Sequence, residues 1–156
     1  MNRSALTLAA FLAVTFAAAG VGSLFTASSV GSWYATVAKP SWTPPNWVFG
    51  PAWTVLYSLM AIAAWLVWRR VGLSGASVAL GLYFAQLGLN VAWSGLFFGL
   101  RNIGAALVDI VGLWLLILFT TRAFWRRSHA ASILLLPYLA WASFAAALNL
   151  AIWRLN

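Results

Sequence analysis

Long stretches of apolar residues dominate the chain, and charged residues stand at their ends. No charged residue occurs between Arg3 and Lys39, between Lys39 and Arg69, or between Arg70 and Arg101. Each gap exceeds the roughly 20 residues that a helix needs to cross the hydrocarbon core of a bilayer. The pattern predicts several membrane-spanning helices, whereas a closed β-barrel would show alternating segments of about ten residues.

Five of the apolar runs are near spanning length, and we expect each to form one transmembrane helix. They cover residues 5–25, 48–68, 76–100, 103–121 and 130–153. Short turns that contain arginine separate the last four runs, so neighbouring helices should run antiparallel. We therefore predict an all-α membrane protein in which residues 1–156 form a single five-helix bundle.

The first run also resembles a secretory signal peptide, because it follows Arg3 and contains three consecutive alanines at residues 17–19. It is longer than a usual signal core, and its Ala, Gly and Ser content suits a helix packed closely against neighbours. We favour a retained helix over a cleaved signal.

Residues 28–47 form the only long connection and are rich in Pro, Ser and Trp. Proline lacks a backbone donor and interrupts helices, so this segment should not be one continuous helix. We expect a structured loop at the membrane surface, or a lid over one end of the bundle.

The formal charge of +8 arises from nine basic residues scattered in ones and twos at the ends of the apolar runs. Nucleic-acid binding would call for a basic stripe, so nucleic acid is not an expected partner. With five crossings, six basic residues fall on the side of the N-terminus and three on the other. The positive-inside rule then places the N-terminus in the cytoplasm, which for a bacterial cell means residence in the inner membrane.

The eleven tryptophans exceed what aromatic belts at the membrane surface require. Four near the span ends fit such belts: Trp65, Trp68, Trp125 and Trp153. Three lie within spans that also carry uncharged polar groups: Trp53, Trp93 and Trp141. Large flat rings that line a cavity offer stacking area to a flat apolar ligand, and a few polar groups would orient it.

One face of the third run combines polar and aromatic side chains. Gln86, Asn90, Trp93 and Phe97 are spaced 4, 3 and 4 residues apart, so they share a helix face. The two amides either serve a ligand or simply hydrogen-bond across helices, which stabilises transmembrane bundles by about 0.6 kcal/mol on average. Asn149 in the fifth run has the same two interpretations.

Small residues recur along the third run, a pattern that lets two helices approach closely. They include Ser77, Gly81, Ala85, Gly88 and Ala92. This face either pairs with a second copy of the chain or packs inside one protomer.

Asp109 is the only acidic residue and lies about two turns into the fourth run, where an ionisable group is costly. It either pairs with a basic residue such as Arg101 or Lys39, or it contacts a ligand or takes part in proton transfer. The chain has no Glu or Cys and a single histidine, His129. No paired carboxylates, activated nucleophile or metal site can be assembled, so we expect neither a metal nor a required cofactor.

Four separated stretches together resemble the TspO/MBR family, whose members are called tryptophan-rich sensory proteins, translocator proteins or peripheral-type benzodiazepine receptors. The first joins Trp33 and Tyr34 to residues 39–45, 49 and 51–57. The others are residues 86–94, 106–109 and 137–149. The resemblance covers essentially the whole chain, in matching order.

The resemblance implies a five-helix bundle, commonly dimeric, with a pocket that binds porphyrins and synthetic ligands and is closed by the first loop. The pocket positions that match are Tyr57, Asn90, Trp93, Ser94, Phe97, Ala145 and Leu148. The matching lid positions are Trp33, Lys39, Pro40, Trp42 and Pro44. A porphyrin, or another flat hydrophobic molecule, is thus the ligand that the resemblance implies.

Trp53 and Trp141 match the two tryptophans that the family is thought to use in light- and oxygen-dependent porphyrin breakdown. The leading hypothesis is tetrapyrrole binding for sensing, transport or control of photo-oxidative damage. The alternatives are weak porphyrin-degrading activity and a dimeric scaffold or transporter. Leu150 stands where the family's proposed cholesterol motif has an aromatic residue, so we do not expect sterol binding there.

Overall fold

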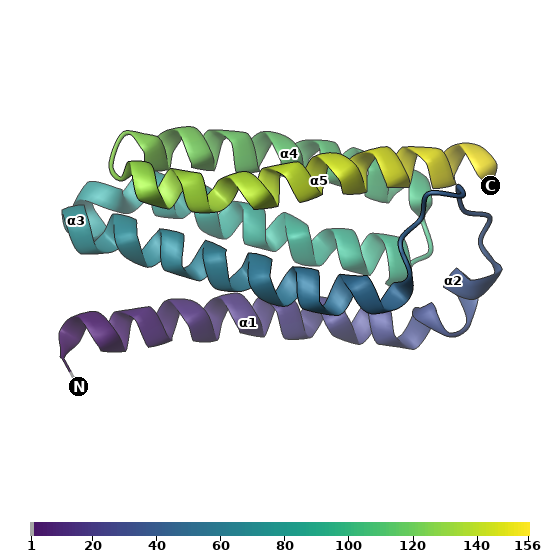
Figure 1. The fold of residues 1–156 in the computed structure, drawn as a ribbon, viewed down its shortest axis with the longest axis horizontal. Coiled ribbons are helices and arrows are strands. Elements are labelled where there is room, and N and C mark those ends of the chain that lie inside the picture. The colour runs from purple at the N-terminus through teal and green to yellow at the C-terminus, as the bar shows by residue number, and fades with distance from the viewer. Residues whose placement is uncertain (1) are drawn as a thin grey trace.

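The structure is a computed structural model and describes residues 2–156, which form a bundle of long helices (Figure 1). In chain order the elements are α1 Arg3–Val30, α2 Trp33–Thr36, α3 Asn46–Ser94, the π-helix η1 Gly95–Gly99, α4 Ile103–Trp125 and α5 His129–Leu155. Four helices are long and apolar enough to cross a membrane, namely α1, α3 together with η1, α4 and α5. The prediction of an all-helical membrane protein is therefore confirmed for the described residues.

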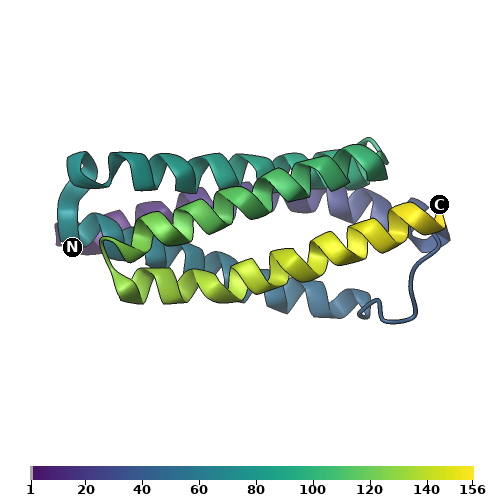
Figure 2. The ribbon, with the colours of Figure 1, turned by 90° about the horizontal axis from the view of Figure 1, so that it is seen from above.

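Helix α3 is interrupted at Gly72, whose φ of 68° and ψ of −177° are not helical. Essentially only glycine adopts this backbone region, because a Cβ atom would clash there. Figures 1 and 2 show the ribbon reversing direction at this turn. The element therefore consists of two antiparallel arms, residues 46–71 and residues 73–94, which correspond to the second and third predicted runs.

Side-chain caps define where several helices begin. Asn2 Oδ1 accepts a hydrogen bond from the Ala5 backbone N at 2.9 Å, and Asn102 Oδ1 accepts one from Ala105 N at the same distance. Ser128 Oγ caps α5 in the same way. Such caps satisfy donors that the first turn of a helix leaves unpaired.

The core lies along the inner faces of α3, α4 and α5, with α1 packed against α3 and η1. Its largest fully buried side chains include Tyr83, Tyr138, Phe124, Met60 and Ile117. Outward-facing positions are also apolar, such as Val108, which is 75% exposed, as expected for a surface that meets lipid. A second cluster, which includes Tyr34, Phe97 and Leu148, lies beneath α2.

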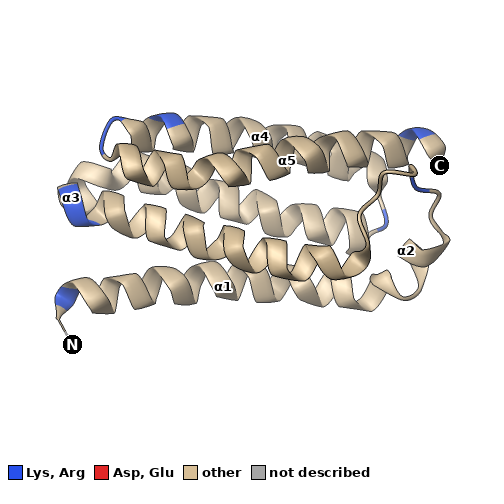
Figure 3. Cartoon of the chain, in the orientation of Figure 1, with Lys and Arg blue, Asp and Glu red and all other residues tan. Residues whose placement is uncertain are grey.

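The Lys and Arg residues lie at the two ends of the bundle (Figure 3). The N-terminus lies at one end together with the turn of α3 and the α4–α5 connection. The C-terminus lies at the other end, beside α2 and the connection to α3 (Figure 1). Among the tryptophans expected in belts, Trp125 and Trp153 are half exposed near helix ends, while Trp65 and Trp68 are half-buried.

Candidate functional site

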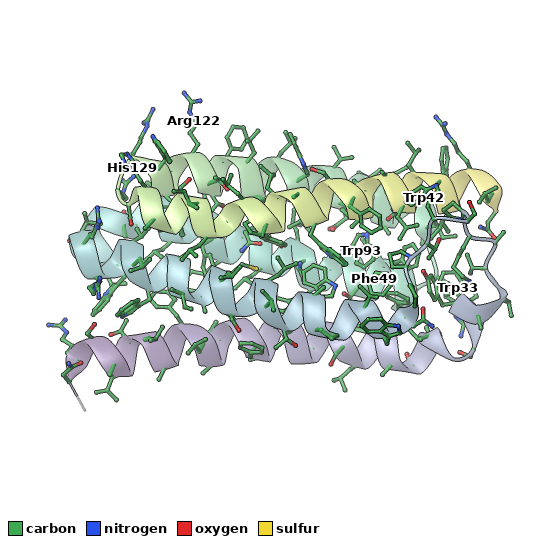
Figure 4. The ribbon with its side chains drawn as sticks, viewed as in Figure 1. Trp33, Trp42, Phe49, Trp93, Arg122 and His129 are labelled. Atoms are coloured by element: carbon green, nitrogen blue, oxygen red, sulfur yellow. The ribbon has the colours of Figure 1, made fainter. Side chains whose placement is uncertain are left out.

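A cavity of about 560 Å³ lies between the helices in the half of the bundle nearer α2. All four long helices and η1 contribute to its lining, which is mostly aromatic and aliphatic. Figure 4 shows Phe49 and Trp93 between the helices, with Trp33 and Trp42 toward the loop end. The volume falls within the 300–1,000 Å³ range typical of small-molecule sites.

Aromatic rings from three segments form one wall of the cavity. Trp53 packs against Tyr57 with ring centroids 5.3 Å apart and meets the Trp141 ring edge-on at 6.2 Å. Phe49 contacts Trp141 at 5.8 Å. Trp93 and Phe97 stack at 5.0 Å, as their spacing of four along the chain predicts. The wall therefore offers both ring faces and ring edges to a bound molecule.

A chain of neutral hydrogen bonds closes one side of the cavity. The Tyr57 hydroxyl donates to Asn90 Oδ1 at 2.6 Å, and Asn90 Nδ2 donates to the Tyr138 hydroxyl at 2.9 Å. That hydroxyl in turn donates to Gln86 Oε1 at 2.9 Å. This chain links both arms of α3 to α5 and is buried, so each of its polar atoms is expensive to leave unpaired.

Asn149 fixes the orientation of Trp93. The indole Nε1 of Trp93 donates to Asn149 Oδ1 at 3.0 Å, and Asn149 Nδ2 donates to the Ile103 carbonyl at 3.0 Å. Because Ile103 begins α4, this bridge joins the ends of three helices beside the cavity. Asn149 thus serves the packing of the bundle and also lines the site.

The connection between α1 and α3 packs over the cavity end through aromatic contacts. Trp33 meets Phe97 edge-on at 5.7 Å, and Trp42 meets Phe144 at 5.9 Å. Lys39 Nζ donates to the Tyr34 carbonyl at 2.6 Å and to the Val37 carbonyl at 2.8 Å. These two hydrogen bonds engage the lysine ammonium and hold residues 34–39 in a compact turn.

The C-terminus ties the same segment down. Asn156 Oδ1 accepts a hydrogen bond from Ala38 N at 3.1 Å, and Asn156 Nδ2 donates to the Ala38 carbonyl at 2.9 Å. Burial raises the pKa of the Tyr34 phenol above its ordinary value, so this side chain stays neutral. Pro40 and Pro44 lie half-buried on either side of a turn in which Thr43 N donates to the Pro40 carbonyl.

All nine residues predicted to contact a ligand line this one cavity: Trp53, Tyr57, Asn90, Trp93, Ser94, Phe97, Trp141, Ala145 and Leu148. The five predicted lid residues do not line it themselves. Trp33 and Trp42 instead cover lining rings, while Lys39, Pro40 and Pro44 shape the segment that carries them.

Several lining residues were missed from the sequence, including Tyr138, Phe49, Phe144 and the α1 positions Phe16 and Gly20. For Gln86, ligand contact and hydrogen bonding across helices were both open; it does not line the cavity, is only 1% exposed, and its Oε1 accepts from the Tyr138 hydroxyl of α5. For Phe49 and Tyr138, presence within the family-like stretches was a signal that could have found them. The Ala- and Gly-rich α1 carried no such signal.

The ion pair considered for Asp109 is not formed. Its Oδ2 atom is buried without a hydrogen-bond partner among residues 2–156. Lys39 is occupied by backbone carbonyls, and Arg101 is exposed in the turn before α4. That interpretation is therefore wrong for the described residues, since Lys39 Nζ is engaged by backbone carbonyls and no ion pair joins Asp109 to Arg101.

The stripe of small residues on the second arm of α3 faces outward. Ser77, Gly81, Ala85 and Gly88 are exposed, and Ala92 is half-buried. A Cβ atom added at Gly81 or Gly88 would meet no atom within 4 Å. Packing inside the protomer therefore does not explain the stripe.

Metal ligands do not cluster in the described part of the chain, where no three His, Cys, Asp or Glu side chains could hold an ion together. The ring of His129 stacks on Trp125 at 4.1 Å, at the end of the bundle opposite α2.

Comparison with known sequences assigns the chain to a family. The sequence model of the TspO/MBR family matches residues 10–154. The chain belongs to this family. A tryptophan-rich protein TspO from Archaeoglobus fulgidus is 50% identical over 150 residues, which cover 96% of this chain and 94% of that protein. The human translocator protein is 47% identical over 138 residues, covering 87% and 82% of the two chains.

A third member of the TspO/MBR family, the tryptophan-rich sensory protein of Cereibacter sphaeroides, is 40% identical over 156 residues, covering 100% of this chain and 95% of its own. Identity at this level extends over the whole length, so the helices and the cavity lie within the matched region. Membership and the apolar helices together identify an integral membrane protein.

Proposed function

We propose that the protein binds a tetrapyrrole, or another flat and largely apolar ring molecule, in the cavity between its helices. The observation that carries this proposal is the combination of broad aromatic rings with a few fixed neutral polar groups around one cavity. Rings of Trp53 and Trp141 supply stacking area, and the Tyr57–Asn90–Tyr138 chain supplies oriented polar atoms. The names of the relatives, sensory protein and translocator protein, fit capture of a small molecule in a membrane.

The charge of the site suggests how such a ligand lies. No charged side chain is among the residues that line the cavity. Burying an unpaired carboxylate in an apolar site is costly, so acidic substituents of a tetrapyrrole should point toward the loop end. The macrocycle itself then lies against the tryptophans.

Titration of the solubilised protein with protoporphyrin in the dark tests this proposal. Saturable quenching of tryptophan fluorescence is expected, and Trp141→Ala or Asn90→Ala should weaken binding. Trp125→Phe is the matched control, because Trp125 is half exposed and lies outside the cavity. Quenching that never saturates and equals that of empty detergent would refute the proposal.

A second candidate function is light- and oxygen-dependent breakdown of the bound porphyrin. It is favoured by the contact of Trp53 with Trp141, two oxidisable rings 6.2 Å apart in one cavity. The photoexcited ligand and molecular oxygen would supply the reaction, while the protein positions the ring. This makes any catalysis weak and dependent on illumination.

Absorption spectra recorded under light, with and without oxygen, separate the two functions. Oxygen-dependent bleaching should vanish in Trp53→Phe and in Trp141→Phe while dark binding persists. Bleaching that continues in both variants would remove the enzymatic role and leave a carrier or sensor.

We further propose that the helices cross the bilayer five times, with the two arms of α3 as separate spans and the N-terminus in the cytoplasm. The basic residues at the N-terminal end of the bundle support this orientation (Figure 3). Because the chain has no cysteine, Ser41→Cys and Arg126→Cys provide unique probes at opposite ends. An impermeant thiol reagent added outside the cell should label the first and spare the second; the reverse pattern would overturn the orientation.

Homodimerisation is supported by the outward-facing stripe of small residues, and it would suit a scaffold or transporter as well as a binding protein. Ala85→Leu should weaken crosslinking of the solubilised protein. Ala147→Leu, an exposed position on α5, is the control with the same added volume. Equal assembly in the two variants would exclude this face as the interface.

A further inference from the structure

A second, basic groove lies at the opposite end of the bundle from the ligand cavity. It has a volume of about 490 Å³ and opens to the surface between the start of α1 and the turn of α3. Its lining consists of Arg3, Trp68, Arg69, Gly72, Leu73 and Ser74. The only acidic residue of the chain, Asp109, lies near the start of α4 at the other end.

A tryptophan brings the two arginines together. Trp65 Nε1 donates to the Ser4 carbonyl at 3.0 Å, which fastens the first turn of α1 to the first arm of α3. The Arg69 guanidinium lies over the Trp65 ring at 4.4 Å from its centroid. Arg3, in this first turn, and Arg69 both line the groove.

The guanidinium groups of Arg3 and Arg69 have no acceptor among the described residues, unlike those of Arg70 and Arg127 near the same turn. Arg127 Nε donates to the Gly75 carbonyl at 2.9 Å, and Arg70 Nη1 contacts the Arg127 carbonyl at 3.5 Å. Within residues 2–156 no hydrogen bond or ion pair engages the guanidinium of Arg3 or Arg69. A guanidinium that no acceptor engages keeps its N–H donors available, and a phosphate can accept two of them.

We propose that this groove binds the phosphate headgroup of an anionic phospholipid. The half-buried Trp65 and Trp68 mark the level of the membrane surface, which is where lipid phosphates lie. Gly72 has no Cβ and Ser74 adds an exposed hydroxyl, so the groove has room and a further donor. Unpaired arginines at this level attract anionic lipids of the adjoining leaflet.

Native mass spectrometry of the full chain tests the site by counting bound lipids. The probes are phosphatidylglycerol and phosphatidylcholine with identical acyl chains, because they differ in headgroup charge. Phosphatidylglycerol should bind preferentially, and each of Arg3→Gln and Arg69→Gln should weaken it about fivefold, the factor expected for one basic residue at a membrane surface. Arg3→Gln changes only the first, exposed turn of α1, so it leaves the bundle intact.

The matched control is the pair Arg101→Gln and Arg154→Gln, which removes the same charge from the other end of the bundle. Its phosphatidylglycerol binding should stay within about twofold of the parent. An equal loss in the control would show that net charge alone explains the effect, and this would refute the site. Unchanged binding in Arg3→Gln/Arg69→Gln would also refute it. Glycerol 3-phosphate at millimolar concentration should not displace the lipid; displacement would make the groove a site for soluble phosphates and overturn the lipid assignment.

Discussion

Replacing Tyr138 by phenylalanine isolates the polar chain beside the cavity, because it removes one oxygen and leaves the ring in place. The Tyr138 hydroxyl accepts from Asn90 and donates to Gln86, so two interhelical bonds are lost. Gln86 Nε2 already lacks a partner among the described residues, and Oε1 would then lose its own. At about 0.6 kcal/mol for each bond between transmembrane helices, Tyr138→Phe should lower the free energy of unfolding by about 1.2 kcal/mol.

Tyr57→Phe is the matched comparison. It removes the same atom from the same side-chain type but breaks one bond, the 2.6 Å contact with Asn90. The expected loss is about 0.6 kcal/mol. Unfolding in mixed micelles with increasing sodium dodecyl sulfate, followed by helical circular dichroism, measures both values.

A double-mutant cycle between Tyr138→Phe and Asn90→Leu then isolates the bond that the two residues share. Its coupling energy should be about 0.6 kcal/mol, because the Gln86 bond is lost only with the tyrosine oxygen. A Tyr57→Phe loss as large as that of Tyr138→Phe, or a coupling energy of zero, would refute the reasoning that the hydroxyl of Tyr138 is the branch point.

Three further results are expected. Gly72→Ala should lower the free energy of unfolding by about 1–3 kcal/mol, because the backbone at the α3 turn is one that alanine adopts only with strain. Gly50→Ala is the control, since Gly50 is helical and an added Cβ would meet no atom within 4 Å, and it should not lower the stability. Equal effects of the two substitutions would contradict the role of the turn. Lys39→Gln should speed amide hydrogen exchange in residues 33–45 about tenfold, because the hydrogen bonds from the Lys39 ammonium to two backbone carbonyls are lost. Unchanged exchange would show that these bonds do not hold the segment in place. Asn149→Leu should broaden the Trp93 side-chain NMR signal by freeing its indole, and an unaltered signal would argue for packing alone.

The helical class could be predicted because a bilayer permits few solutions for long apolar runs. The bounds were less predictable. The second run was expected to end at residue 68, but the helix continues through Arg69 and Arg70 to the turn at Gly72. Charged side chains do not end a helix, whereas a glycine with positive φ does. The fourth run was expected to end at residue 121, and α4 continues to Trp125.

The candidate site was predictable where helix periodicity or family-like stretches marked it. The spacing of Asn90, Trp93 and Phe97 places them on one face, and all three line the cavity. Partner choice was not predictable, because it depends on which helices meet. Tyr138 joins two amides of α3, and Asp109 Oδ2 has no partner among residues 2–156, because of the way α4 and α5 pack against α3.

The contribution of α1 was hidden for a different reason. Its alanines and glycines line the cavity because they leave room for it, and they supply no polar or aromatic group. A Cβ atom at Gly22, for example, would lie 3.2 Å from Ser94 Oγ. Absence of a side chain carries no positional signal in a helix that is already rich in alanine and glycine.

The turn at Gly72 bears on how the chain is made. Because only Gly72 separates the two arms of α3, no long loop allows one arm to enter the bilayer well before the other. Residues 46–71 would have to wait at the translocon until residues 73–94 emerge from the ribosome, and the two would then insert together as a hairpin. In the proposed five-span topology, the two arms of α3 should therefore enter the membrane together rather than one after the other.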